Sequence, residues 1–159
     1  MIFVTVGTTH FQFDRLLSAV AGLETEEELV VQRGPSRVPL RNARVIDFLS
    51  FDELNDRVRQ ADTVITHAGV GSIMVALSLG KRPVVVPRLE RFGEAVDDHQ
   101  VQVATQLDRT GRVRAVLDLG DLKRVVASAT DAHEQGGLLL GPLVEVVADE
   151  VRRAASRRA

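Results

Sequence analysis

The stretch VITHAGVGSIMVALSLGKRPVVVP, residues 64–87, decides the fold of this 159-residue chain. It predicts an apolar strand over 63–66, a bend with two glycines, a helix over 72–79 that stops at Gly80, and a second apolar strand over 83–86. Strands that are apolar throughout and separated by helices favour a parallel sheet, because helices then cover both of its faces.

The same alternation of strands and helices runs along the rest of the chain. Strand patterns cover 2–6, 28–32, 43–46 and 112–116, and helical patterns cover 13–21, 50–58, 98–107, 121–129 and 142–157. Ser50 and Glu53 fit a capping box at the start of the second helix. The sequence therefore predicts one α/β domain over residues 1–159 with a doubly wound, mostly parallel sheet. The helix over 142–157 is a candidate for docking a partner.

Composition excludes several kinds of function. The formal net charge of −2 gives no reason to expect nucleic acid as a partner, and the absence of cysteine excludes disulfides, thiolate metal sites and a cysteine nucleophile. The apolar start lacks a basic leader, so we expect no export signal and a cytoplasmic location. The longest apolar tract, 64–79, contains Thr66, His67 and Ser72 and makes a poor membrane span, so any membrane role should be peripheral.

The bend between the strand and the helix of the opening stretch lies where α/β sheets bind ligands, beyond the carboxyl end of a strand. Gly69 and Gly71 let the backbone approach a ligand closely, and the first amides of the following helix carry partial positive charge. Together they predict an anion site suited to a diphosphate. The pattern is neither a P-loop nor a complete dinucleotide fingerprint, and a tight turn without ligand is the alternative.

Two further segments lie at the same predicted edge of the sheet. Gly7, Thr8, Thr9 and His10 follow the first strand and offer hydroxyls, an imidazole and backbone amides, although Thr8 and Thr9 also suit helix capping. Residues 93–100 combine acids, an imidazole and an amide at another helix start. That mixture of donors and acceptors suits sugar hydroxyls.

Three motifs, taken in order, carry a resemblance to a known family. They are His-Ala-Gly-x-Gly-Ser-Ile from His67, Gly-Lys-x-Pro-x-x-x-Pro from Gly80, and Asp-His-Gln from Asp98. They resemble the C-terminal, nucleotide-sugar-binding half of family 28 glycosyltransferases, which implies a Rossmann-like half of a GT-B fold. The opening Met-Ile-Phe-Val-Thr-Val-Gly-Thr and the Phe-Asp-Arg-Leu at 13–16 resemble the small soluble subunits of two-component glycosyltransferases, and the resemblance extends to about residue 130.

The resemblance implies roles for particular residues. The nucleotide and phosphate site would consist of His67, Ala68, Gly69, Val70, Gly71 and Ser72 together with Gly7, Thr8 and Thr9. Phe48 would flank the uracil, with a place in the core as the alternative. The donor sugar would contact Asp98, His99 and Gln100. Arg88 and Arg91, near this segment, would suit the carboxylate of a uronate sugar, with ordinary surface arginines as the alternative.

The resemblance also implies that the chain is one half of an inverting glycosyltransferase. It would bind a UDP-sugar, while a membrane-anchored partner subunit would bind a polyprenyl-linked acceptor. No cofactor or metal is expected, and the base would be His10 or a residue of the partner. Val75 replaces a glutamate with which many members bind ribose, and with the Arg91–Glu94 lead-in it favours the bacterial exopolysaccharide branch. The alternatives are a non-catalytic enhancer of a related transferase and an orphan nucleotide-binding domain.

Overall fold

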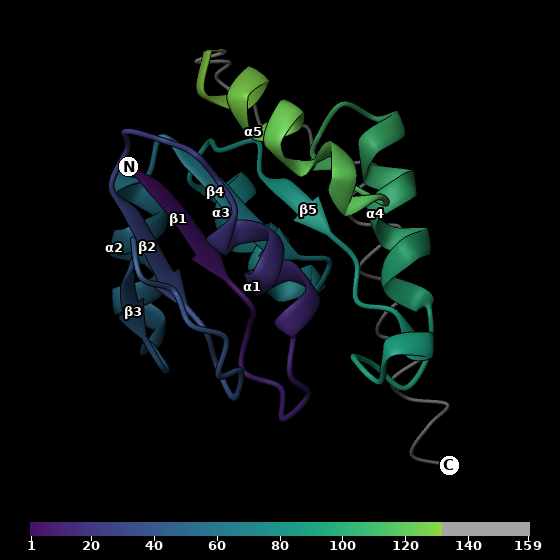
Figure 1. The fold of residues 1–159 in the computed structure, drawn as a ribbon. Coiled ribbons are helices and arrows are strands. Elements are labelled where there is room, and N and C mark those ends of the chain that lie inside the picture. The colour runs from purple at the N-terminus through teal and green to yellow at the C-terminus, as the bar shows by residue number, and fades with distance from the viewer. Residues whose placement is uncertain (132–159) are drawn as a thin grey trace.

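Six parallel strands form one sheet in the computed structural model, which describes residues 1–131 (Figure 1). The strands are β1 (Ile2–Thr5), β2 (Leu29–Gln32), β3 (Arg44–Ile46), β4 (Thr63–His67), β5 (Val84–Val86) and β6 (Arg114–Ala115). Their order across the sheet is β3-β2-β1-β4-β5-β6, and every neighbouring pair is parallel. The chain changes direction across the sheet between β1 and β4, which is where such sheets bind ligands.

Helices cover both faces of this sheet. The helices are α1 (Asp14–Ala21), α2 (Phe51–Gln60), α3 (Val70–Ser78), α4 (His99–Arg109) and α5 (Leu122–Asp131), with short 3₁₀ turns η1 (Glu90–Phe92) and η2 (Leu119–Asp121). One buried cluster joins α1 and α5 to the strands, and two others join α2, α3 and α4 to the opposite face. The doubly wound α/β fold predicted from the sequence is thereby confirmed.

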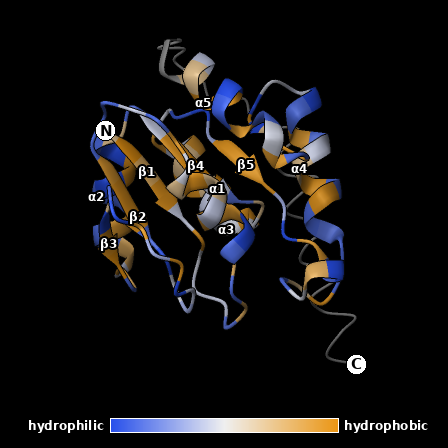
Figure 2. Cartoon of the chain, in the orientation of Figure 1, coloured by the Kyte–Doolittle hydropathy of each residue, from blue (hydrophilic) through white to orange (hydrophobic). Residues whose placement is uncertain are grey.

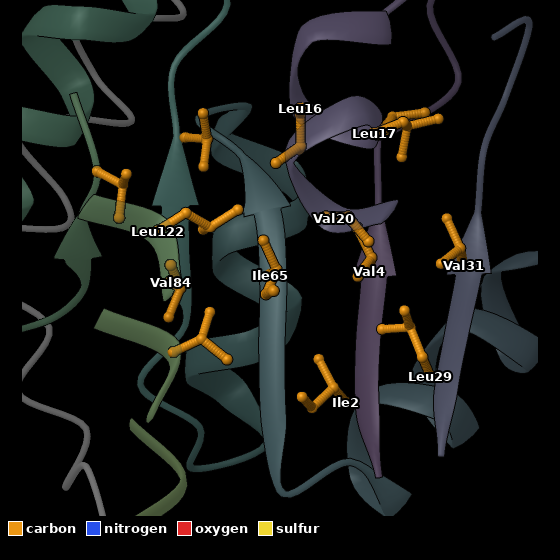
Figure 3. Packing of buried hydrophobic residues seen from close by; sticks show 14 of the residues in the cluster. Ile2, Val4, Leu16, Leu17, Val20, Leu29, Val31, Ile65, Val84 and Leu122 are labelled. Atoms are coloured by element: carbon orange, nitrogen blue, oxygen red, sulfur yellow. The ribbon is translucent and has the colours of Figure 1, made fainter. Parts of the chain in front are cut away.

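Strands β1, β2 and β5 are largely hydrophobic, as Figure 2 shows, and their apolar residues are buried. On the face covered by α1 and α5, Leu16, Val20 and Leu122 pack over Val4 and Ile65 (Figure 3). Fully burying a side chain of this type stabilises a fold by about 1.5–3 kcal/mol. This packing holds the carboxyl ends of β1 and β4 side by side, so that the loops that follow them meet.

One helix boundary at the site differs between the structure and the prediction from sequence. α3 begins at Val70, two residues before the predicted start at Ser72, because Gly69 takes the N-cap position with extended backbone angles (φ −75°, ψ 127°). Gly71 therefore lies in the first helical turn. The predicted helix over 142–157 lies outside the described residues. Within residues 1–131, no helix combines the length and apolar character that crossing a membrane requires.

The capping box predicted at the second helix is confirmed. The Ser50 hydroxyl accepts a hydrogen bond from the Glu53 amide (3.3 Å), and the Glu53 carboxylate accepts one from the Ser50 amide (2.8 Å). We expect Ser50→Ala to lower the free energy of unfolding by about 1 kcal/mol, measured by urea denaturation. Glu53→Gln is the matched control, since glutamine also closes this motif. An unchanged urea midpoint in Ser50→Ala would contradict the assignment.

Candidate functional site

A cavity of about 330 Å³ lies at the carboxyl ends of β1, β2 and β4, where the strand order reverses. We call it the switch-point pocket. Its lining residues are Thr5, Gly7, Thr8, Gln32, Leu49, Phe51, Leu54, His67, Gly71, Ser72 and Val75. The structure thus brings together the two predicted loops, one after β1 and one between β4 and α3. Five of the predicted nucleotide-site residues line the pocket: Gly7, Thr8, His67, Gly71 and Ser72.

The other predicted residues of the two loops do not line the switch-point pocket. Ala68 is buried in the cluster under α3 and α4, and Gly69 forms the N-cap of α3. Thr9 accepts a hydrogen bond from the Phe11 amide (3.4 Å), which is a local turn contact rather than a helix cap. These residues shape the backbone beside the pocket.

The start of α3 forms the anion-binding corner of the pocket. No side chain of residues 1–131 caps this helix, and its first turn carries no acidic residue. The first amides of a helix have no partner within the helix and carry partial positive charge, so they attract an anion. A Cβ atom at Gly71 would meet no atom of the described residues within 4 Å, apart from the backbone of its own helix. The space above these amides is therefore open to a ligand.

The opposite wall of the pocket is apolar. It consists of Leu49, which precedes the N-cap of α2, Phe51 and Leu54 from the first turns of α2, and Val75 of α3. Such a wall suits the flat face of a nucleobase, which is apolar enough to stack on aromatic and aliphatic side chains. Phe51 was not among the predicted site residues, because it comes from another segment of the chain and carries no local signal for a site. Phe48 is 55% exposed and does not line the pocket, so the alternative that placed it in the core was wrong.

His67 forms part of the pocket floor as a neutral side chain. Its ring packs so closely on two glycines that a Cβ at Gly7 would come within 2.5 Å of Cε1, and a Cβ at Gly69 would collide with Nε2. Burial, and after it the positive charge of Arg88, lowers the pKa of His67 to about 3, against the opposing effect of a hydrogen bond to the Thr5 backbone. The imidazole therefore shapes the floor without adding positive charge near neutral pH.

The depressed pKa of His67 predicts a pH dependence of stability. In the unfolded chain His67 takes up a proton below its ordinary pKa of 6.5, whereas the folded protein takes it up only near pH 3. The contribution of His67 is therefore fully present above pH 6.5 and is lost as the pH falls toward about 3. We expect His67→Gln to lose less stability than the wild type on acidification, measured by urea denaturation at several pH values. Parallel pH profiles for the two proteins would contradict this.

His10 lies at a second hollow and not in the switch-point pocket. The hollow measures about 610 Å³ and is lined by His10, Phe11, Gln12, Asp14, Arg15, Pro35, Phe92, Gly93 and Glu94. The His10 ring is exposed and lies 4.2 Å from the Phe11 ring, measured between centroids. His10 thus lines a different hollow from Gly7 and Thr8, and its role as a base stays a prediction.

Arg88 has a structural place that its sequence position did not indicate. The side chain is 1% exposed, and its guanidinium donates hydrogen bonds to backbone oxygens of Val6 (2.8 Å), Phe11 (3.2 Å), Gln12 (3.0 Å) and Glu94 (3.2 Å). Burial lowers its pKa to about 10, so it stays protonated at neutral pH. The structure corrects the expectation of a sugar contact or a surface arginine, since the guanidinium binds the chain's own carbonyl groups.

The predicted donor-sugar residues Asp98, His99 and Gln100 lie at the start of α4, beyond the end of β5. The Asp98 carboxylate accepts a hydrogen bond from the Glu90 amide (2.9 Å), and the Gln100 side-chain oxygen accepts one from the Arg88 amide (3.1 Å). They do not line the switch-point pocket, and their role toward a sugar stays a prediction. In the described part of the chain, no three His, Asp or Glu side chains are placed to hold a metal ion.

The chain is similar to known proteins along most of its length. Residues 1–136 match the glycosyltransferase family 28 C-terminal domain. The UDP-N-acetylglucosamine transferase subunit ALG13 of Homo sapiens is 32% identical in an alignment of 156 positions that covers 86% of this chain and 13% of that protein. The protein of the same name from Yarrowia lipolytica is 39% identical over 81 residues, which are 51% of this chain and 38% of that protein.

Solved structures share the fold at low sequence identity. The glycosyltransferase of kitacinnamycin superposes with a TM-score of 0.63 at 18% identity, over 91% of this chain and 37% of that one. The calicheamicin glycosyltransferase CalG4 superposes with a TM-score of 0.56 at 18% identity, over 99% of this chain and 44% of that one. The chain thus spans well under half the length of each of these relatives. By sequence, it belongs to the family of glycosyltransferase family 28 C-terminal domains.

Proposed function

We propose that this chain is the donor-binding subunit of a two-component inverting glycosyltransferase, with the nucleoside diphosphate of a UDP-sugar in the switch-point pocket. One observation carries the proposal: the uncapped start of α3 and the loop after β1 meet in one cavity whose other wall is apolar. Amides for a diphosphate and a surface for a base thus occur in one place. Membership of family 28 supports this assignment.

The donor we propose to test first is UDP-N-acetylglucosamine. Two relatives are named as subunits of a transferase for this sugar. The case for a uronate donor loses its main support, because Arg88 is buried against backbone carbonyls. The acceptor hydroxyl attacks the anomeric carbon, the bond from that carbon to the diphosphate breaks, and the proton of the hydroxyl passes to a base. The amides at the start of α3 stabilise the charge that grows on the departing diphosphate.

A partner subunit completes the proposed enzyme. It is a membrane-anchored protein that binds a polyprenyl-linked acceptor and keeps this chain at the cytoplasmic face of the membrane. The word subunit in the names of the relatives supports an assembly of this kind. The base is His10, which is exposed at the neighbouring hollow, or a residue of the partner. The exopolysaccharide context stays a prediction, since the named relatives are N-acetylglucosamine transferases.

A calorimetric titration of the isolated chain tests the proposal. We expect UDP and UDP-N-acetylglucosamine to bind, and inorganic phosphate alone to bind far more weakly because it lacks the base. A chain that bound none of these nucleotides would refute donor binding and favour the non-catalytic enhancer. Co-expression with the acceptor-binding subunit, followed by a transfer assay over a panel of UDP-sugars, then identifies the donor.

A further inference from the structure

Gln32 is a buried polar side chain at the floor of the switch-point pocket. It is the last residue of β2, it is 2% exposed, and it lines the cavity together with Thr5, Gly7 and Thr8. It faces Thr5 directly in the register between β1 and β2. A buried carboxamide is stable only when its donors and its acceptor find partners. Its partners therefore show what it does.

Every hydrogen-bonding group of the Gln32 carboxamide is used within the protein. Its oxygen accepts from the Thr5 hydroxyl, and its NH₂ group donates to the backbone oxygens of Gly7 (3.0 Å) and Asp47 (3.2 Å). The Gly7 amide donates in turn to the Thr5 hydroxyl oxygen (3.2 Å). Thr5, Gln32 and Gly7 thus form a closed ring of hydrogen bonds. Because both N–H donors are taken, Gln32 acts on a ligand only through the residues it holds.

The residue it holds most directly is Gly7. Gly7 has a φ of +79°, a conformation that favours glycine, and the His67 ring packs against its Cα. The C=O of Gly7 and the N–H of Thr8 belong to one trans peptide and point in opposite directions. With the Gly7 oxygen fixed on Gln32, the Thr8 N–H points away from Gln32. Within residues 1–131 no hydrogen-bond partner is recorded for that N–H.

We propose that Gln32 is a positioning residue of the donor site: it fixes the Gly7–Thr8 peptide so that the Thr8 N–H is presented to an oxygen of the diphosphate. This inference rests on the proposed function. A peptide without this restraint is free to turn over, which would aim the Gly7 oxygen at the ligand and repel a negatively charged group. Gln32 thereby supports the second anion-binding loop, while α3 supplies the first.

The test compares UDP with uridine, which has the same base and ribose but no phosphate. We expect Gln32→Met, which keeps the length of the side chain and removes its donors, to weaken UDP binding about tenfold and to leave uridine binding unchanged. Binding of both is measured by NMR titration, which also follows the Thr8 amide signal. In the wild type that signal should shift on addition of UDP, and in Gln32→Met it should shift much less. Gln106→Met, an exposed glutamine on α4, is the matched control.

A second pair of variants keeps the inference open to refutation if Gln32→Met does not fold. Thr5→Val removes the hydroxyl of the ring and should also weaken UDP binding selectively, whereas Thr5→Ser keeps the hydroxyl and should bind normally. A folded Gln32 or Thr5→Val variant with wild-type affinity for UDP would overturn the inference. So would an equal loss of UDP and uridine, which indicates a general loosening of the pocket. If the wild type itself bound no UDP, the proposed function would fail instead.

Discussion

Replacing Gly71 by aspartate should weaken UDP binding at least about 100-fold and leave the protein at least as stable as the wild type. Gly71 is the second residue of α3, and within residues 1–131 a Cβ there would meet no atom outside its own helix backbone within 4 Å. An acidic residue in the first turn stabilises a helix, and glycine is a poor helix former, so both effects favour the folded variant. The same carboxylate would occupy the corner proposed for the phosphates. Two unit charges about 4 Å apart repel by about 4 kcal/mol near a protein surface, so we expect affinity to fall about 100-fold or more.

The matched control for this variant is Gly71→Asn, which has nearly the same size without the charge. Calorimetric titration with UDP should show a much smaller loss for Asn than for Asp, and thermal unfolding should show that both variants are folded. A Gly71→Asp protein that bound UDP normally would place the phosphates elsewhere. Equal losses for Asn and Asp would mean that space, and not charge, controls this corner.

The fold could be predicted from sequence because its strands carry a local signal. The runs at 2–6, 28–32, 63–66 and 83–86 are apolar on both faces, as expected for strands between two layers of helices. The predicted helix over 72–79 started two residues late, because the glycine pair suggested a bend where Gly69 is the N-cap and Gly71 is already helical. Local patterns thus identified the elements and missed a boundary that depends on backbone angles.

The site could be predicted only where its residues share one loop. The glycines and hydroxyls after β1 and β4 stand next to each other in the sequence, and the rule for parallel sheets brings both loops to one edge. Gln32 and Phe51 came from other segments and had no such local signal. The register that pairs Thr5 with Gln32 would have pointed to Gln32, but register is a property of the assembled sheet.

Arg88 is the clearest case of a residue whose role depends on distant parts of the chain. Its carbonyl partners at Val6, Phe11 and Gln12 lie 76 to 82 positions earlier in the sequence. The sequence alone does not distinguish an arginine that binds a carboxylate ligand from one that binds the chain's own carbonyl groups. The structure instead stacks its guanidinium over the Phe13 ring, 4.5 Å from the centroid, and uses it to tie the loop after β1 to the loop after β5.

Arg88→Met should therefore lower the free energy of unfolding by at least about 3 kcal/mol, a loss typical of a broken buried polar network. The variant leaves the backbone oxygens that Arg88 binds without this donor at a buried position. Arg88→Lys should also be strongly destabilising, because a single ammonium cannot reach oxygens on several sides as the planar guanidinium does. Urea denaturation measures both losses.

Arg91→Met is the matched control, since Arg91 is exposed and stacks only on the exposed Phe92 ring. Its stability should change by less than about 1 kcal/mol, as for other surface positions. The two possible roles of Arg88 predict opposite results. If Arg88 bound the donor sugar, the Arg88→Met protein would lose affinity for UDP-sugars and keep its stability. If Arg88 ties two loops together, the Arg88→Met protein loses stability. Its affinity for UDP then falls as well, because Val6 and Phe11 flank the Gly7–Thr8 loop.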